Sequence, residues 1–374
     1  MKLFAPALLA ASLFTSDMSA ADATFYLGTY TKPGKSQGIY VGTLNTETGK
    51  LGPVRLAAEA KNPSFVALSP NGKNLYASGE GSTPGQGMLA FAVQPDGTLK
   101  ALNTGDTGGA GNCHVWVDAT GGTAFAANYG GGSIAAFRLQ PDGSLGERSA
   151  FVQFTGSSVN PKRQEKPHAH AIYTDPANKF VYSPDLGTDN VWIFKFDAAK
   201  GTLTPANPAS GKVPPGSGPR HLAFHPNGKL AFTCNEMTLT ATAFSRDPET
   251  GALKEIHTVS TLPPNTEIKG YSTAETFVHP TGKWLYVSNR THDTIAVLAI
   301  ADDGKLTLIE NAPAGVKVPR GFGPDPSGKW LIAGGQSDDK IAVHKIDPTT
   351  GKLTLTSETA EVGAPVCVLF VPAK

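Results

Sequence analysis

PDGTL (95–99) is one of seven copies of a short phrase in which a turn glycine is followed, after one residue, by leucine. The other copies read ETGKL (47–51), PDGSL (141–145), AKGTL (199–203), ETGAL (249–253), DDGKL (302–306) and TTGKL (349–353). Their glycines follow one another at spacings of 46 to 58 residues. A phrase that recurs at such a period indicates a repeat architecture, in which one structural unit is built several times.

Six of the repeats also contain two apolar stretches joined by a polar turn. These segments are FVALSPNGKNLYAS (65–78), VWVDATGGTAFAAN (115–128), AIYTDPANKFVYSPD (171–185), LAFHPNGKLAFTCNE (222–236), TFVHPTGKWLYVSNR (276–290) and GFGPDPSGKWLIAGG (321–335). Val, Phe, Tyr and Ile around Asn-Gly or similar turns predict β-hairpins. A third alternating strand, such as GMLAFAV (87–93), lies before the glycine turn, and a fourth follows it. Four antiparallel strands per repeat are typical of a β-propeller blade.

The two ends of the chain supply the seventh blade together. The N-terminal part offers three strands, TFYLGTY (24–30), GIYVGTL (38–44) and LGPVRLA (51–57), but no innermost strand. The C-terminal APVCVLFVP (364–372) resembles the innermost strands of the other repeats and has no hairpin partner after it. If it joins the first blade, the ring is closed and no sheet edge is left unpaired. The sequence therefore predicts an all-β, seven-bladed propeller with four antiparallel strands per blade.

Composition limits the partners and the number of domains. The 374 residues carry a formal net charge of +1, which argues against nucleic acid or an anionic membrane surface as the main partner. A repeat array lengthens without enlarging one core, so residues 22–374 are expected to form one domain. We expect this domain to act as a monomer on a small molecule, with no cofactor.

The first 21 residues differ from the rest and resemble a secretory signal peptide. Lys2 precedes the apolar stretch LFAPALLAASLF (3–14), and small residues at Ser19, Ala20 and Ala21 offer cleavage sites. The apolar stretch is too short to span a bilayer. The protein is therefore expected to be periplasmic or secreted.

The three cysteines, Cys113, Cys234 and Cys367, are an odd number for an oxidising compartment, so at least one thiol is expected to be free. All three lie on predicted inner strands, where cysteine commonly acts as a small buried apolar residue. Cys113 next to His114 suggests a nucleophile and its base, but adjacent residues on a strand point to opposite faces. The buried interpretation is favoured.

Polar residues gather where the inner strands begin and where the next strands end. The beginnings carry GNCH (111–114), KPHAH (166–170), GPRH (218–221), STAE (272–275) and VPRG (318–321). The ends carry NY (128–129), PDLG (184–187), CNE (234–236) and SNR (288–290). In an antiparallel pair these two positions meet at one edge of the sheet. Arg220 with Glu236, and Glu275 with Arg290, are thus expected to converge on one mouth of the central channel.

Convergent His, Arg and carboxylate groups at a concave site suit a reaction on an anionic substrate. A structural interpretation competes for each group. His221, His225 and His279 are expected to bond turn backbone, whereas His168 and His170 remain open between the two roles. The arginines of GPRH and SNR could instead pair with Glu236 and Asp185 to fix the blades.

Taken together, these phrases resemble the lactonase family of seven-bladed propellers, which includes bacterial 6-phosphogluconolactonases and fungal carboxymuconate lactonising enzymes. The resemblance rests on KPHAHA (166–171), DLGTDNVWIF (185–194), GPRHLAFHPNGK (218–229) and HPTGKWLYVSNR (279–290), and it spans residues 24–372 in order. It implies a sugar-lactone hydrolase that uses no metal. Two departures from the family pattern are Phe277, where relatives usually have histidine, and Pro324, which interrupts a strand.

The resemblance also implies site residues. The catalytic set proposed for the fungal branch of the family, one His, two Arg and one Glu, maps by motif onto His170, Arg220, Glu236 and Arg290. We add five residues near them as substrate-binding candidates: His114, His168, Asp185, Glu275 and Arg320.

Other functions remain open from the sequence. A carboxymuconate-type lactonising isomerase would use the same site. A metal-dependent lactonase would need a cluster of oxygen ligands, for which Glu80, Asn128, Asp185 and Glu236 are candidates. A non-catalytic exported propeller would bind a partner through an apolar or aromatic channel mouth. Which lactone is the substrate, and whether it is phosphorylated, does not follow from the sequence.

Overall fold

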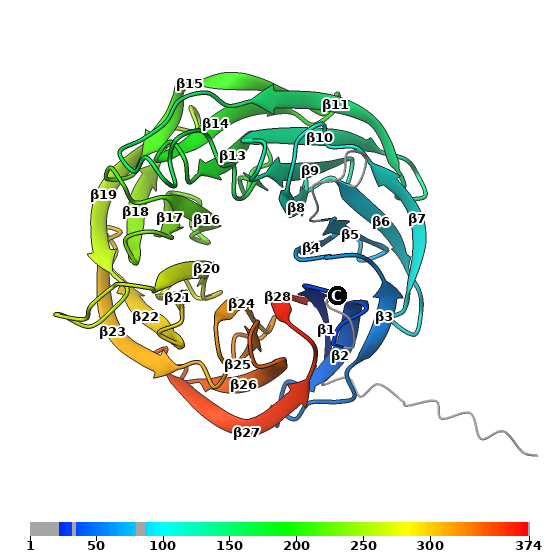
Figure 1. Ribbon diagram of the computed structural model, residues 1–374, viewed down its shortest axis with the longest axis vertical. Helices are drawn as coiled ribbons and strands as arrows, with labels where there is room; N and C mark the ends of the chain where they lie inside the picture. The colour runs from blue at the N-terminus through cyan, green and yellow to red at the C-terminus, as the bar shows by residue number, and fades with distance from the viewer. Residues whose placement is uncertain (1–21, 32–34, 80–86, 373–374) are drawn as a thin grey trace, which may run out of the picture.

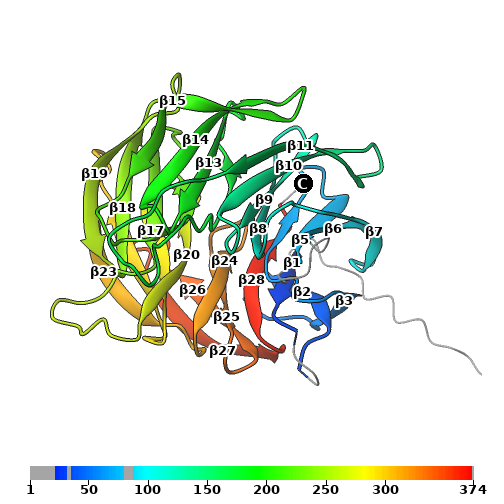
Figure 2. The same ribbon diagram turned by 45° about the horizontal axis from the view of Figure 1, so that its top comes forward.

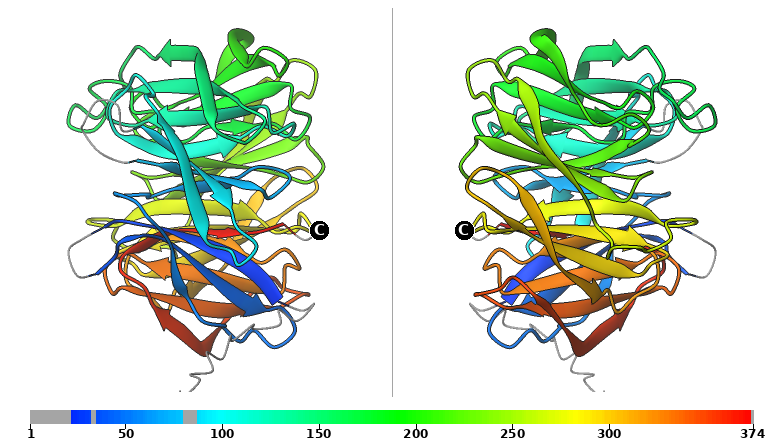
Figure 3. Two further views of the ribbon diagram at one scale, coloured as in Figure 1. Left: turned by 90° about the vertical axis from the view of Figure 1, so that its right-hand side faces the viewer. Right: turned by 90° about the vertical axis from the view of Figure 1, so that its left-hand side faces the viewer.

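The computed structural model describes residues 22–31, 35–79 and 87–372. In this part of the chain, 28 strands form seven four-stranded antiparallel sheets. The sheets are arranged radially around a central axis, as the view down that axis shows (Figure 1). Tilted and edge-on views show the same ring of neighbouring blades (Figures 2 and 3). The predicted seven-bladed propeller is confirmed.

Each blade runs from an inner strand at the channel to an outer strand at the rim. Blade one contains β28 (Pro365–Phe370), β1 (Asp22–Thr29), β2 (Gly38–Asn45) and β3 (Arg55–Glu59). Blade two contains β4 (Val66–Leu68), β5 (Asn74–Ser78), β6 (Met88–Val93) and β7 (Leu99–Gly105). Blade three contains β8 (Asn112–Val117), β9 (Thr123–Asn128), β10 (Ser133–Leu139) and β11 (Leu145–Gln153). Blade four contains β12 (Tyr173–Thr174), β13 (Phe180–Asp185), β14 (Asn190–Asp197) and β15 (Thr202–Lys212).

The last three blades repeat the same order. Blade five contains β16 (Pro219–Phe224), β17 (Leu230–Asn235), β18 (Thr240–Arg246) and β19 (Leu253–Ser260). Blade six contains β20 (Ser272–Val278), β21 (Trp284–Arg290), β22 (Thr294–Ile300) and β23 (Leu306–Pro313). Blade seven contains β24 (Pro319–Pro324), β25 (Trp330–Gly335), β26 (Lys340–Ile346) and β27 (Leu353–Glu361). Contrary to the expectation from the sequence, Pro324 does not interrupt its strand: it is the last residue of β24 and pairs with Leu331.

The C-terminal strand closes the ring. Strand β28 pairs antiparallel with β1, from Phe25 opposite Phe370 to Thr29 opposite Pro365. In Figure 1 the red strand lies beside the blue ones as the inner strand of blade one. Because the first and last strands share one sheet, blade one has no free inner edge. The predicted closure is confirmed.

The repeated glycine turns connect each blade to the one before it. All seven turn glycines have φ between +69° and +86°, a region in which glycine pays no steric penalty. Gly351 also lies so close to the blade-six Trp284 that a Cβ would come within 2.4 Å of the indole. The carbonyl of Gly351 accepts a hydrogen bond from the Tyr286 hydroxyl at 2.9 Å. Tyr182 bonds the carbonyl of Gly251 in the same way, at 2.7 Å. The phrase that marks the repeat is therefore an interblade contact.

The hydrophobic core is divided into layers between neighbouring blades. One layer joins Trp284 and Tyr286 of blade six to Leu331 and Ala333 of blade seven. The three cysteines are buried and none forms a disulfide. Cys113 and Cys367 lie on the inner strands β8 and β28, as predicted, but Cys234 lies on β17, the second strand of blade five. The described residues include no helix that is long and apolar enough to cross a membrane. The predicted signal segment, residues 1–21, lies outside the described residues.

Candidate active site

A pocket of about 180 Å³ lies where the inner strands of blades three to seven begin. Its walls are Cys113, Tyr129, His170, Glu236, Arg290 and Arg320. All six residues come from the strand beginnings and strand ends that the sequence analysis grouped. Of the two predicted pairs, Arg220 contacts Glu236 as expected, although it does not line the pocket itself. Arg290 also contacts Glu236, whereas Glu275 lies outside the pocket and contacts His221.

Bulges at the start of the inner strands place one row of these side chains. In β16 the pairing with β17 steps from Pro219 opposite Asn235 to His221 opposite Cys234, so Arg220 has no partner residue. Strands β8 and β24 carry the same irregularity, and there the unpaired residues are Cys113 and Arg320. A bulge redirects a side chain that regular pairing would point into the sheet face. The same local defect therefore brings a residue from three blades toward the channel mouth.

The second row comes from the ends of the neighbouring strands. Tyr129 follows β9, Glu236 follows β17, and Arg290 is the last residue of β21. In blade five the N–H of Glu236 donates to the carbonyl of Gly218 at 2.8 Å, which holds this end of β17 against the start of β16. The two rows consequently face one another across the pocket.

Glu236 is the centre of the site. Its Oε2 lies 2.9 Å from Nη2 of Arg290 and 3.4 Å from Nε of Arg220. Its Oε1 accepts a hydrogen bond from Nη2 of Arg163 at 2.6 Å. Burial alone would raise the pKa of Glu236, but the charges of Arg290, Arg220 and Arg163 outweigh it and lower the pKa to about 2. Glu236 is thus an ionised carboxylate at neutral pH, held by three guanidinium groups.

Arg220 and Arg290 each have N–H groups that do not bond to the Glu236 carboxylate. The contact of the Arg220 Nε with Glu236 is an ion pair by distance but not a hydrogen bond. The Nε atoms of both arginines are buried and have no hydrogen-bond partner in the described structure. Arg290 also donates through Nη2 to the carbonyl of Thr273 at 2.9 Å. Unsatisfied guanidinium donors beside a pocket can bind a charged oxygen of a ligand.

His170 faces Glu236 from blade four. Its Nε2 lies 3.9 Å from Oε2 of Glu236, and its Nδ1 lies 3.8 Å from Sγ of Cys113. Burial, reinforced by the charge of Arg220, lowers the pKa of His170 well below its usual value of 6.5. The imidazole is therefore neutral and has a lone pair available as a proton acceptor.

The strand that carries His170 is shorter than expected. The sequence predicted a regular inner strand, whereas β12 covers only Tyr173–Thr174. Upstream of it, Ala169 forms a single bridge with Asp185, and the N–H of His168 donates to the Asp185 carboxylate at 2.7 Å. A side chain thus replaces a backbone acceptor, and the regular ladder is lost.

The predicted substrate-binding residues lie in different places. Arg320 lines the pocket, but His168, His114, Asp185 and Glu275 do not. Asp185 accepts hydrogen bonds from Thr188, Trp192 and the N–H groups of His168 and Gly187. His114 is fully buried against Phe65, with ring centroids 4.0 Å apart. His168 stacks on Tyr129 at 4.6 Å.

One histidine prediction was wrong and two were right. His225 and His279 bond turn backbone, as expected, through the carbonyls of Gly282 and Gly328. His221 instead contacts two side chains: its Nδ1 lies 2.7 Å from Oε1 of Glu275, and its Nε2 lies 3.0 Å from Nη1 of Arg220. The bulge at Arg220 explains the difference, because without it adjacent strand residues would point to opposite faces.

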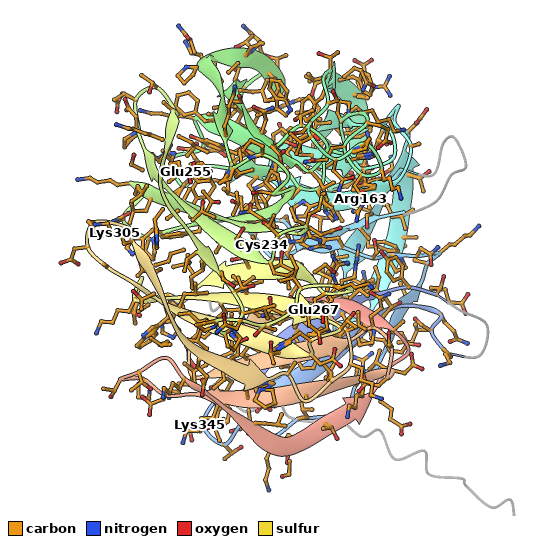
Figure 4. All side chains as sticks on the ribbon, turned by 60° about the vertical axis from the view of Figure 1, so that its left-hand side comes forward. Arg163, Cys234, Glu255, Glu267, Lys305 and Lys345 are labelled. Carbon is orange, nitrogen blue, oxygen red and sulfur yellow. The ribbon has the colours of Figure 1, made fainter. Side chains whose placement is uncertain are left out.

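Sequence reasoning missed Arg163, and it grouped Tyr129 and Cys113 with the polar strand ends without naming them as site residues. Arg163, labelled in Figure 4, lies in the long loop before β12 and is the most exposed of the three arginines that contact Glu236. It also donates to the Tyr129 hydroxyl at 3.2 Å. A residue in an irregular loop has no repeat position, so periodicity could not locate it. Charge in the segment NPKRQEK (160–166) was the one available signal.

The candidates for a metal site do not form one cluster. Among the described residues, no group of three or more His, Cys, Asp or Glu side chains could hold a metal ion. Of the proposed ligands, Asp185 is occupied by its hydrogen bonds, and Glu236 is held by arginines. Glu80 lies outside the described residues.

Comparisons with known proteins agree with the geometry. The family model described as "Lactonase, 7-bladed beta-propeller" matches residues 24–370. A 6-phosphogluconolactonase of Bacillus subtilis (strain 168) is 36% identical over 350 residues, which cover 92% of this chain and 97% of that protein. A 6-phosphogluconolactonase of Formosa agariphila is 32% identical and covers 88% of this chain and 94% of its own length.

Solved structures extend the comparison. The periplasmic gluconolactonase of Pseudomonas aeruginosa has a TM-score of 0.87 at 26% identity, covering 94% of this chain and 100% of that chain. A protein from Lactobacillus plantarum has the same TM-score at 32% identity, covering 94% and 99%. The blade count, the ring closure and the matched length lead to one assignment. The chain belongs to the lactonase family of seven-bladed β-propellers, and 6-phosphogluconolactonases are among its relatives.

Proposed function

We propose that this protein hydrolyses a sugar lactone, in the manner of a 6-phosphogluconolactonase, in the pocket around Glu236 and without a metal ion. The observation that carries the proposal is a single ionised carboxylate in contact with three arginines and facing a neutral histidine 3.9 Å away. Ester hydrolysis needs a proton acceptor for water and positive charge near the carbonyl oxygen. Both are present in this pocket.

In the proposed reaction, a water molecule attacks the ring carbonyl carbon. As the new C–O bond forms, the carbonyl electrons move onto oxygen, and His170 takes a proton from the water. The guanidinium groups of Arg220 and Arg290 stabilise the oxyanion. When the carbonyl re-forms, the ring C–O bond breaks and the leaving alkoxide takes the proton from His170. The product is the open hydroxy acid.

His170 suits the role of base better than Glu236 does. A carboxylate whose pKa is about 2 is a weak base near neutral pH, because its proton affinity is far below that needed to remove a proton from water. His170 is neutral, and its Nε2 lies 3.9 Å from Glu236; with the ring proton on Nδ1 toward Cys113, this Nε2 carries the lone pair that accepts a proton. In this proposal Glu236 fixes the arginines and stabilises the imidazolium that forms during the reaction.

Charge favours an anionic substrate. Four guanidinium groups, those of Arg163, Arg220, Arg290 and Arg320, lie at or beside a pocket that has Glu236 as its one lining carboxylate. Arginine suits bidentate binding of a carboxylate or phosphate. The substrate is therefore proposed to carry a negative group besides the lactone ring.

The location of the protein bears on which lactone is used. We propose that residues 1–21 direct export and are removed, which fits the relative from Pseudomonas aeruginosa described as a periplasmic gluconolactonase. Other relatives are described as 6-phosphogluconolactonases. Both a phosphorylated and an unphosphorylated aldonolactone therefore belong in the test. Native protein that begins between Ala21 and Thr24 supports export, and an intact Met1 contradicts it.

The test is a panel of lactones with and without phosphate. The wild type is expected to open at least one of them well above the buffer rate, with unchanged activity in EDTA, and to release the hydroxy acid. Loss of Arg220 or Arg290 is expected to lower kcat by about 10²–10³ if it stabilises the oxyanion, but to raise KM chiefly if it binds the anionic tail. No turnover above buffer for any lactone contradicts the proposal. Activity lost in EDTA and restored by a divalent cation contradicts its metal-free form.

A further inference from the structure

His221 and Glu275 are two buried side chains that do not line the pocket. His221 contacts Arg220 at Nη1, a different nitrogen from the one that faces Glu236, and Glu275 contacts His221 from the other side of the ring. His221 lies on β16 and Glu275 lies on β20, which are the inner strands of neighbouring blades. Both strands are bulged at this point, and the bulge in β20 lies between Thr273 and Thr276. The irregular strand starts thus bring an Arg, a His and a Glu into one hydrogen-bonded row.

The direction of every hydrogen bond in this row is determined by arginine. A guanidinium group has only donors, so Nη1 of Arg220 donates to Nε2 of His221 over 3.0 Å. Nε2 must therefore be the unprotonated nitrogen of the neutral ring. The proton of His221 then sits on Nδ1 and is donated to Oε1 of Glu275 over 2.7 Å. Burial, with the charge of Arg220, lowers the pKa of His221 well below 6.5, so this contact is a hydrogen bond of a neutral ring and not an ion pair.

The acceptor oxygen of Glu275 is fixed as well. The N–H of Thr276 donates to the same Oε1 at 2.9 Å. Arg220 is held a second time, because its Nη1 also donates to the carbonyl of Ala274. Two acceptors therefore hold one nitrogen of the guanidinium plane, while its buried Nε remains without a hydrogen-bond partner beside the pocket.

We propose that Glu275 and His221 are positioning residues that fix the orientation of Arg220, so that its Nε edge lies toward Glu236 at the wall of the pocket that receives the lactone. This inference rests on the proposed function. Glu275 sets the tautomer of His221, and that tautomer supplies the acceptor for Arg220. If the imidazole proton moved to Nε2, two N–H groups would face each other and Arg220 would turn away. Neither residue is required to touch the substrate.

The first test asks whether Glu275 matters as a hydrogen-bond acceptor for His221 or only because its side chain fills space. In E275M the volume is similar but His221 loses its acceptor, so kcat is expected to fall by about 10- to 100-fold, a loss typical of a misplaced catalytic group. E275Q is expected to recover most of that loss, because the N–H of Thr276 selects the amide oxygen for the Oε1 position. KM is expected to change less than kcat in both variants.

A double-mutant cycle then asks whether Glu275 acts through Arg220. In the R220A background, E275M is expected to change kcat by less than about twofold, because the group that it positions is gone. Equal losses in both backgrounds overturn the inference, as does a folded E275M with wild-type kcat.

A readout independent of catalysis keeps the inference testable if E275M does not fold or if no lactone is turned over. Histidine labelled with ¹⁵N reports which ring nitrogen carries the proton, and H221Q identifies the His221 signal among the nine histidines. The wild type is expected to show the proton on Nδ1. A proton on Nε2 overturns the inference whatever the activity, whereas a wild type that opens no lactone contradicts the proposed function alone.

Discussion

At the scale of single residues, Glu236 determines the charge of the site. Its carboxylate neutralises part of the positive charge of the three arginines that contact it, and those arginines in turn keep it ionised. A buried carboxylate in such contacts is expected to stabilise the fold as well as the reaction, because its loss leaves buried positive charge without a partner. Activity and stability are therefore linked at this residue.

Removal of the Glu236 charge is expected to lower the stability of the fold by an amount that depends on pH. E236Q should lower the free energy of unfolding by roughly 3 kcal/mol near neutral pH. The folded pKa of Glu236, about 2, is below its ordinary value of 4.5. The stabilisation is thus fully present above pH 4.5 and is lost as the pH falls toward 2. Urea unfolding of both proteins across this range measures it. If the difference in unfolding free energy between the wild type and E236Q does not become smaller in acid, Glu236 is not the ionised group that stabilises the fold.

Because His170 is neutral, we can predict how kcat/KM depends on pH below neutrality. Because burial lowers its pKa well below 6.5, kcat/KM for an unphosphorylated lactone should stay constant from pH 7 to pH 6. An unphosphorylated substrate is needed because a phosphate would titrate in this range. The rate in buffer is subtracted at every pH. A fall to half near pH 6.5 would show an ordinary histidine and contradict this environment.

At the scale of strands and turns, the sequence predicts the regular parts and misses the irregular ones. Hairpins and glycine turns recur with their own residue signals, so their positions follow from the repeat. The bulges at Cys113, Arg220 and Arg320 have no such signal, because they depend on how β8, β16 and β24 pair across the sheet. The proximity of Arg220 and Glu236 could be predicted, because the start of one strand and the end of the next meet at the same sheet edge. The contact of His221 with Glu275 could not be predicted, because it depends on the bulge at Arg220.

The turn glycines give a test at this scale. Gly351 has φ +72°, and a Cβ there would come within 2.4 Å of Trp284, so G351A meets both backbone strain and an interblade clash. Gly72 has a similar φ of +68° with no atom within 4 Å, so G72A meets strain alone, roughly 1–2 kcal/mol. Thermal unfolding should rank G351A as clearly less stable than G72A. Equal melting temperatures contradict the role of this turn between blades.

At the scale of the whole molecule, ring closure is what keeps the pocket assembled. The pocket draws residues from blades three to seven, and the hydrophobic layers that hold these blades join neighbours around the ring. The closure between β1 and β28 could be predicted because the N-terminal part lacked an inner strand and the C-terminal part had a spare one. The contribution of Arg163 could not, because its loop belongs to no repeat.

Truncation tests the closure. Deletion of residues 362–374 removes β28, opens the ring and exposes an edge of β1, so the protein should unfold or aggregate. Deletion of 372–374 leaves β28 and its pairing intact and serves as the matched control. Expression, solubility and melting temperature are the measurements. A soluble protein without residues 362–374 that melts like the control contradicts the closure as the source of stability.

The most direct test of the proposed function is the kcat of H170A on the best lactone of the panel. Because His170 is the proposed proton acceptor, kcat should fall by about 10²–10⁴ relative to wild type, while the melting temperature changes little. Within the described residues, the only hydrogen bond of the side chain is the weak contact of Nδ1 with Cys113, so its removal should spare the fold. An H170A protein that opens the lactone at the wild-type rate contradicts the proposed chemistry of this pocket.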